Sequence, residues 1–150
     1  MSTELIANHI YGPSYVSIES ALSYYGLIPE RVYTTRSITT NRSKKFENSV
    51  GYFDYVTVND DYYSIGIKQE IVENNYTFLI ATPEKALCDL ITSTPKLRIQ
   101  SLKALITYLE EDIRFDMSAL EDMDVNIIKE CIKFGKKKEI FKIVLKVLEQ

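Results

Sequence analysis

Residues with special chemistry are scarce in this chain. Its 150 residues include no tryptophan, one histidine (His9) and two cysteines, Cys88 and Cys131, which lie far apart in the sequence. These residues do not have the spacing of a zinc site, so we expect neither a metal nor a cofactor. The separated cysteines fit a reducing compartment, where free thiols behave as small buried apolar side chains.

Long apolar runs and glycine clusters are also missing. No stretch approaches the ~20 apolar residues that span a bilayer, and residues 1–10 lack the basic start of a signal peptide. Five glycines are scattered singly, so no glycine-rich phosphate loop is present. We therefore expect a cytoplasmic location and no membrane partner.

The overall composition is that of an ordinary globular domain. Hydrophobic residues make up 45% of the chain and charged residues 26%, and the length fits one domain, residues 1–150. The net charge of −3 differs from the basic balance typical of a dedicated nucleic-acid domain.

Three zones follow one another along the chain. Residues 1–30 have the caps and apolar spacing of helices, residues 31–81 are rich in β-branched and aromatic residues, and residues 82–150 return to helical spacing. Short connections between the strands favour antiparallel neighbours. The sequence therefore predicts an α+β fold, in which a small, mostly antiparallel sheet from about 31–81 packs with N-terminal and C-terminal helices.

Local signals predict several element boundaries. Ser17 is the expected N-cap of a helix that ends at Gly26, and Thr82 followed by Pro83 begins another helix. Three further signals are a turn at 59–61 followed by a strand, a helix opening at 94–95, and a capping box at 118–121.

Charge is segregated in the strand zone. Residues 31–45 contain five basic side chains and no acid, and they are interleaved with hydroxyl groups. Such a segment suits contacts with a phosphate backbone, which position a protein without reading base sequence. The candidate contact residues for DNA, RNA or an acidic partner are Arg36, Thr40, Arg42, Lys44 and Lys45. The alternative is a solvated loop beside an edge strand whose charged side chains prevent it from pairing with another chain.

Two other groups of side chains have a functional and a structural explanation. Tyr11, Tyr15, Tyr24 and Tyr25 cluster around Gly12-Pro13 and are a candidate protein contact, because tyrosine combines an apolar body with a polar tip. Alternatively they form the rim of the core. The lysines between 133 and 146 are a second basic set, which is either a further contact surface or the solvated face of a C-terminal helix.

No combination of residues points to catalysis. His9 lies near a terminus, and a catalytic triad would have to use it. Asp60-Asp61 fits a solvated turn, and the strands contain no Glu-x-Lys of the kind that metal-dependent nucleases use. We expect no catalytic residue, with a metal-dependent nuclease remnant as the least favoured hypothesis.

Several stretches together resemble the AbiEi-type antitoxins, the regulator halves of type IV toxin–antitoxin systems. The similarity covers about residues 5–92 and thins out over the C-terminal helices. The stretches are Gly-Pro-Ser-Tyr-Val-Ser at 12–17, Ala-Leu-Ser-Tyr-Tyr-Gly-Leu-Ile-Pro-Glu at 21–30, Thr-Thr-Asn-Arg at 39–42, Phe46, Gly-Tyr-Phe-Asp-Tyr at 51–55, and Ala-Thr-Pro-Glu-Lys-Ala-Leu-Cys-Asp-Leu at 81–90.

The resemblance implies a bacterial abortive-infection system, in which an antitoxin represses its own operon and counters a nucleotidyltransferase toxin. It covers the C-terminal antitoxin domain without the N-terminal winged helix that binds DNA, and it does not imply a stable complex with the toxin. We therefore expect a non-enzymatic, antitoxin-like regulatory domain that acts through a basic surface. The alternative is a protein-interaction module that works with a separate DNA-binding regulator.

Overall fold

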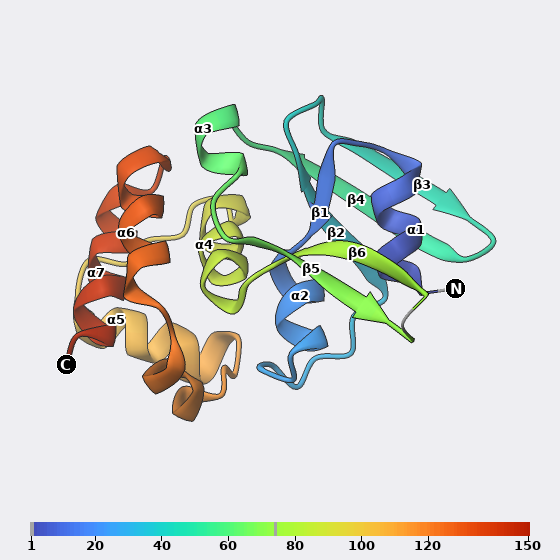
Figure 1. Ribbon diagram of the computed structural model, residues 1–150. Helices are drawn as coiled ribbons and strands as arrows, with labels where there is room; N and C mark the ends of the chain where they lie inside the picture. Colours follow the sequence, from blue (N-terminus) through green and yellow to red (C-terminus); the bar gives the residue numbers. More distant parts are fainter. Residues whose placement is uncertain (1, 74) are drawn as a thin grey trace.

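The computed structural model describes residues 2–73 and 75–150 and has a six-stranded sheet flanked by helices (Figure 1). The strands are β1 (Ser14–Val16), β2 (Thr34–Thr39), β3 (Lys44–Asn48), β4 (Gly51–Thr57), β5 (Ile67–Val72) and β6 (Tyr76–Ala81). Their order across the sheet is β3-β4-β2-β1-β6-β5. The predicted α+β fold is confirmed.

The helices cover the sheet and extend beyond one end of it (Figure 1). They are α1 (Thr3–Ile10), α2 (Ile18–Tyr24), α3 (Asp60–Tyr63), α4 (Pro83–Ser93), α5 (Leu102–Thr107), the π-helical turn η1 (Tyr108–Asp112), the 3₁₀ turn η2 (Met117–Asp122), α6 (Val125–Phe134) and α7 (Lys138–Leu148). Helix α4 packs on α2 and α6, and α7 packs on α5 and α6. No helix in the described part of the chain is long and apolar enough to cross a membrane.

The two faces of the sheet carry different helices. Tyr15 of β1 hydrogen-bonds to Asp89 of α4, whereas the Tyr55 hydroxyl in β4 donates to the Ala7 carbonyl of α1. These two tyrosines lie in adjacent rows of the sheet, and adjacent rows face opposite sides. Helix α1 therefore covers one face, and α4 covers the other.

The sheet has one strand from outside the predicted zone, whereas the antiparallel pairs β1–β2, β3–β4 and β5–β6 agree with the prediction of a mostly antiparallel sheet. β1 lies in the zone predicted to be helical, yet it occupies the middle of the sheet between β2 and β6. Two neighbouring pairs, β1–β6 and β2–β4, are parallel, so the sheet is mixed. A strand can pair in parallel only with a segment distant in sequence, because a crossover must connect the two.

Some helix boundaries are as predicted. The Thr82 hydroxyl accepts from the Lys85 N–H at 3.3 Å and caps α4. Gly26 has φ +74° and follows α2 as its C′ residue, where the Leu27 N–H donates to the Leu22 carbonyl in a Schellman motif.

Other boundary predictions were wrong. The turn at 59–61 is the start of helix α3, with Asn59 as its N-cap. The helix expected to open at 94–95 begins instead at Leu102, where Ser101 is the N-cap. The predicted capping box at 118–121 lies within a 3₁₀ turn that is capped by Asp116.

Candidate functional site

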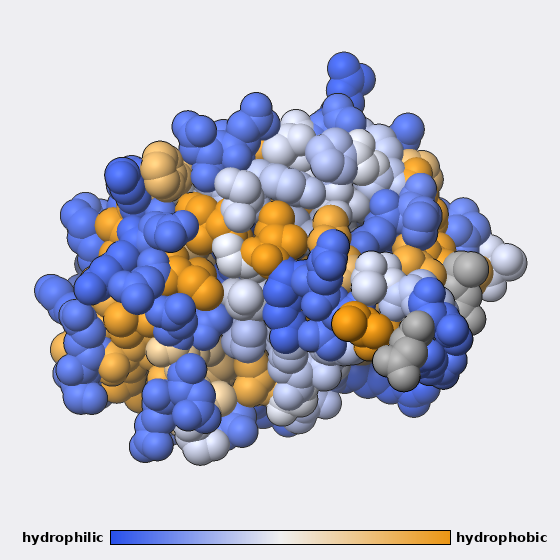
Figure 2. Space-filling model, in the orientation of Figure 1, coloured by the Kyte–Doolittle hydropathy of each residue, from blue (hydrophilic) through white to orange (hydrophobic). Residues whose placement is uncertain are grey.

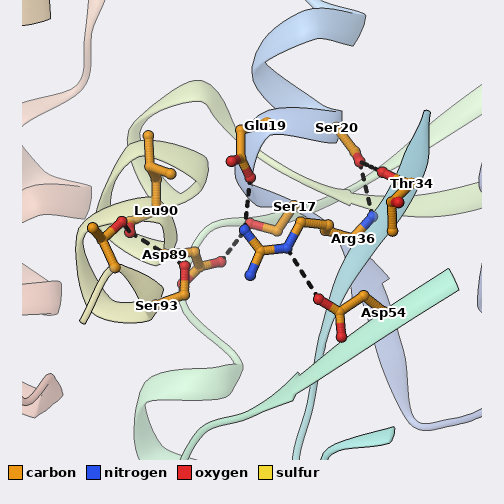
Figure 3. A network of polar contacts seen from close by, with 10 residues as sticks. Ser17, Glu19, Ser20, Thr34, Arg36, Asp54, Asp89, Leu90 and Ser93 are labelled. Atoms are coloured by element: carbon orange, nitrogen blue, oxygen red, sulfur yellow. Dashed lines mark hydrogen bonds and ion pairs between the residues drawn. The ribbon is translucent and has the colours of Figure 1, made fainter. Parts of the chain in front are cut away.

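The basic segment runs through β2, the following loop and the edge strand β3. Arg36 points to two carboxylates, Glu19 of α2 at 2.9 Å and Asp54 of β4 at 3.3 Å (Figure 3). Its side chain is 24% exposed. Because both carboxylates hold its guanidinium, Arg36 fixes α2 to the sheet and offers little free charge to a partner.

The other predicted contact residues follow β2. Thr40 is half-buried, whereas Arg42, Lys44 and Lys45 are exposed, and within the described chain none of these three cations lies within 4 Å of a carboxylate. The Arg42 carbonyl accepts from the Tyr11 hydroxyl at 2.8 Å. This bond fixes the backbone of the loop and leaves the guanidinium exposed.

Lys44 and Lys45 lie on opposite faces of the sheet. Lys44 is opposite Tyr55, on the face covered by α1, and its ammonium lies 5.5 Å from the centre of the Tyr11 ring. Lys45 is opposite Asp54, in the row that also contains Arg36. The five predicted residues therefore do not form one flat surface. The exposed cations instead surround the edge of the sheet at β3.

A hollow of about 330 Å³ lies beside this edge. Lys45, Arg36 and Asp54 line it together with the exposed ring of Tyr52 and neighbouring side chains. Positive charge therefore adjoins aromatic surface at this end of the sheet.

The four tyrosines around Gly12-Pro13 are not one contact surface. Tyr15 is completely buried and cannot take part in such a contact. Tyr25 donates to the Ala81 carbonyl at 2.7 Å, and Tyr24, which is 43% exposed, donates to Glu70 at 3.0 Å. The protein-interaction hypothesis then depends on Tyr11, Tyr24 and Tyr25 alone.

Two of the C-terminal lysines serve helix ends. Lys137 donates to the Thr94 carbonyl at the end of α4 at 2.7 Å, and Lys138 donates to the Ile132 and Lys133 carbonyls of α6 at 2.8 and 2.7 Å. These bonds satisfy carbonyls that have no partner within their helices. They give these two lysines a structural role.

A buried polar network centres on Lys85 of α4. Lys85 has no exposed surface, and its ammonium donates to the carbonyls of Tyr62 and Ile65 at 2.9 and 2.8 Å. It also donates to the Tyr15 hydroxyl at 2.8 Å and lies 4.3 Å from the centre of the Tyr62 ring. Hydrogen bonds and ring faces thus replace the water that this cation loses on burial.

Asp89, one turn further along α4, accepts three hydroxyl groups. Its carboxylate is bonded to Tyr15 at 2.9 Å, Ser17 at 2.6 Å and Tyr62 at 2.7 Å, and it has no exposed surface. The Tyr15 hydroxyl accepts from Lys85 and donates to Asp89, so it joins the cation to the anion. The network therefore ties β1, α3 and α4 together.

Ser17 enters this network through a sharp turn between β1 and α2. Ile18 has φ +57°, a conformation that costs a β-branched residue about 1–3 kcal/mol. Ser17 does not cap α2 with its side chain, because its hydroxyl points to Asp89 (Figure 3). The strained turn thus delivers a hydroxyl group to the buried carboxylate.

Burial shifts the proton affinities of the network. Loss of water raises the pKa of Asp89 and lowers that of Lys85, and each charge partly opposes the shift of the other. Burial, reinforced by the charge of Asp89, raises the pKa of Tyr15 and Tyr62 well above the ordinary value. Both phenols therefore keep their protons in the folded protein at high pH.

Alkaline pH is expected to destabilise the protein through these two phenols. In the unfolded chain each phenol loses its proton at about pH 10, whereas in the folded state it retains its proton. The free energy of unfolding is therefore not reduced by these two phenols below about pH 10, and it falls as the pH rises above that value. The free energy of unfolding should fall by about 1.4 kcal/mol per pH unit for each buried phenol.

Urea unfolding at a series of alkaline pH values measures this slope. Tyr62→Phe removes one of the two phenols, so the free energy of unfolding should fall less steeply with pH, by about 1.4 kcal/mol per pH unit. The substitution should also lower stability at every pH. The lowered pKa of Lys85 makes the free energy of unfolding rise with pH, which opposes the effect of the phenols. This happens only below about pH 10.4, because above it the lysine of the unfolded chain has also lost its proton. Equal slopes in the two proteins would show that Tyr62 does not retain its proton.

Sequence reasoning missed this network, although part of its signal was visible. Lys85 and Asp89 are four positions apart, so they lie on the same face of α4, and their neighbours at 86–88, 90 and 91 are apolar. Opposite charges on the buried face of a helix indicate an internal polar network. Glu84 is also nearly buried, and it accepts from the Asp124 N–H at the start of α6 at 2.8 Å.

No family model, curated protein or solved structure matches this chain. Within the residues that the structure describes, no three histidine, cysteine, aspartate or glutamate side chains are grouped to hold a metal ion.

Proposed function

We propose that this chain is a non-enzymatic, antitoxin-like regulatory domain that acts through a basic surface formed by Arg42, Lys44 and Lys45. In this proposal it works in the bacterial cytoplasm, paired in function with a nucleotidyltransferase toxin. A stable complex with that toxin is not required. The anionic partner is DNA or RNA, with an acidic protein surface as the other chemistry that these cations fit.

The observation that carries the proposal is the placement of these three cations. They come from an acid-free stretch of sequence, and the fold exposes them around one edge of the sheet without a carboxylate within 4 Å in the described residues. Surface cations of this kind bind phosphate groups through charge and release counterions.

The buried network also supports a binding role. The two best-defined stretches of the resemblance, 12–17 and 81–90, supply Tyr15, Ser17, Lys85 and Asp89. The fold encloses their reactive groups and bonds them to one another. In the proposal these stretches therefore maintain the fold, and contact with the partner takes place elsewhere.

Charge reversal tests the proposal. The triple variant Arg42→Glu/Lys44→Glu/Lys45→Glu should abolish protection of cells from a co-expressed nucleotidyltransferase toxin, the partner in function that this proposal assigns. It should also weaken binding to a labelled DNA or RNA oligonucleotide by on the order of a hundredfold at low salt, because three phosphate contacts are lost. Toxicity assays and fluorescence anisotropy measure the two effects.

A matched control changes the same number of exposed cations elsewhere. Arg98→Glu/Lys103→Glu/Lys129→Glu lowers the net charge equally, but it acts in the helical part of the chain. It should retain protection and most of the oligonucleotide affinity. Equal losses in the two triple variants, or full activity of the first, would contradict a role for this edge of the sheet.

A further inference from the structure

β5 forms the edge of the sheet opposite to β3, and it exposes apolar surface. Ile71 is 67% exposed, more than the other aliphatic side chains of the described residues. Hydrophobic colour reaches the surface where the arrow of β5 ends (Figures 1 and 2). An exposed aliphatic residue on an unpaired edge strand is a feature that proteins usually avoid, because it invites pairing with another strand.

Alternate residues of β5 direct their backbone N–H and carbonyl groups to the outer edge of the sheet, where no other strand of the described residues pairs with them. The Asn8 side chain bonds both the N–H and the carbonyl of Leu79 at 2.6 and 3.3 Å, so these groups point away from β5. Gln69, which is opposite Leu79, must therefore direct its own N–H and carbonyl outward. By the same alternation, Ile67 and Ile71 also present their backbone groups at the edge.

The sequence of β5 is complementary to itself when it is read in the opposite direction. Its first five residues are Ile67, Lys68, Gln69, Glu70 and Ile71. We propose that β5 pairs antiparallel with β5 of a second copy of this chain, with Gln69 opposite Gln69. The two sheets then join into one continuous sheet across a twofold axis.

This register satisfies hydrogen bonding, charge and burial together. The outward backbone groups of Gln69 meet those of Gln69 in the second copy, and Ile67 meets Ile71. Lys68 then stands opposite Glu70 of the second copy, and Ile71 is covered by an aliphatic neighbour. Lys68 and Glu70 already lie on one face of the strand, where their side chains meet at 2.7 Å.

Alternative registers are disfavoured by the same residues. Sliding one strand by two residues places Lys68 opposite Lys68, or Glu70 opposite Glu70, and like charges directly opposite are destabilising. Sliding by one residue places residues whose backbone groups point outward opposite residues whose backbone groups already bond to β6, so hydrogen bonds between the two copies are lost. Among these registers, the charge pattern therefore favours the one with Gln69 opposite Gln69.

The other edge of the sheet fits a second copy less well. The exposed residues of β3 include Lys44, Lys45 and Glu47, and its one large apolar side chain, Phe46, is partly buried. Charged edges of this kind resist pairing. A dimer through β5 also leaves the basic edge of β3 accessible.

Sedimentation velocity over a wide dilution series tests the dimer. The wild-type chain should show a concentration-dependent monomer–dimer equilibrium. Lys68→Glu alone and Glu70→Lys alone should each raise the dimer dissociation constant at least tenfold, since two attractive pairs become repulsive. The double variant Lys68→Glu/Glu70→Lys should restore dimerisation, and an equimolar mixture of the two single variants should form heterodimers.

Amide hydrogen exchange distinguishes this interface from pairing at any other surface. The Gln69 amide should become protected as concentration rises, whereas the Glu70 amide, which bonds to β6, should be protected at every concentration. A wild-type chain that stays monomeric throughout the series would overturn the proposal. So would a dimer that persists in both single variants or leaves the Gln69 amide unprotected.

Discussion

Replacing Lys85 by methionine is expected to lower the free energy of unfolding by about 3–5 kcal/mol, because it removes the cation of a buried ionic network and leaves the carboxylate of Asp89 in place. Methionine is close to lysine in length and fills the same space. The expected loss therefore comes from charge and hydrogen bonding, and not from a cavity.

Two separate penalties contribute to this loss. Asp89 would keep its burial but lose the cation that opposes the rise in its pKa. The carbonyls of Tyr62 and Ile65, which now accept from Lys85 at 2.9 and 2.8 Å, would lose their donor. An unpaired polar group in the interior costs about 1–3 kcal/mol by itself.

A double-substitution cycle separates the network from simple packing. Lys85→Met combined with Asp89→Leu should be less destabilising than the sum of the two single changes, because no buried charge remains without a partner. Lys129→Met on the exposed face of α6 is the control, and it should change stability by no more than about 0.5 kcal/mol. Urea unfolding measures all four variants, and additive effects would contradict the coupling of Lys85 with Asp89.

This network also separates loss of folding from loss of function in a cellular assay. A Lys85→Met chain should fail to protect because little folded protein remains, and its soluble level should fall accordingly. The charge-reversal variant at Arg42, Lys44 and Lys45 should fail while remaining folded and abundant. Measuring soluble protein beside protection therefore assigns each residue to the fold or to the contact surface.

Features that depend on neighbouring residues in the sequence were predictable. Capping of α4 by Thr82 needs only a hydroxyl, the following Pro83 and a first acidic turn. The end of α2 needs only a glycine that can adopt a positive φ. Their physical causes lie within one turn of helix, and the sequence therefore reports them.

Features that depend on distant partners were missed or misjudged. β1 is three residues long and pairs with β2 and β6, so its strand conformation comes from distant segments. Arg36 belongs to the predicted basic surface by sequence, but Glu19 and Asp54 neutralise it only once the chain has folded. By contrast, the opposite directions of Lys44 and Lys45 follow from the alternation of any strand and were open to prediction.

Replacing Gly66 by alanine is expected to destabilise the protein by about 3–4 kcal/mol, since it combines backbone strain with a steric clash next to the same network. Gly66 has φ +64°, which favours glycine. A β-carbon there would lie 2.7 Å from the Cβ of Lys85 and 3.0 Å from the Thr82 hydroxyl oxygen. Neither atom is the far end of a flexible side chain, so the start of α4 would have to move.

Gly26 provides the matched control for this experiment. It has a similar φ of +74°, but a β-carbon there would meet nothing within 4 Å. Gly26→Ala should therefore cost only the backbone strain, about 1 kcal/mol. A stability difference of about 2 kcal/mol or more between the two variants would show that the backbone at Gly66, just before β5, must pack closely against Lys85. Equal losses would mean that the contact is looser than the geometry indicates and that strain alone explains the glycine.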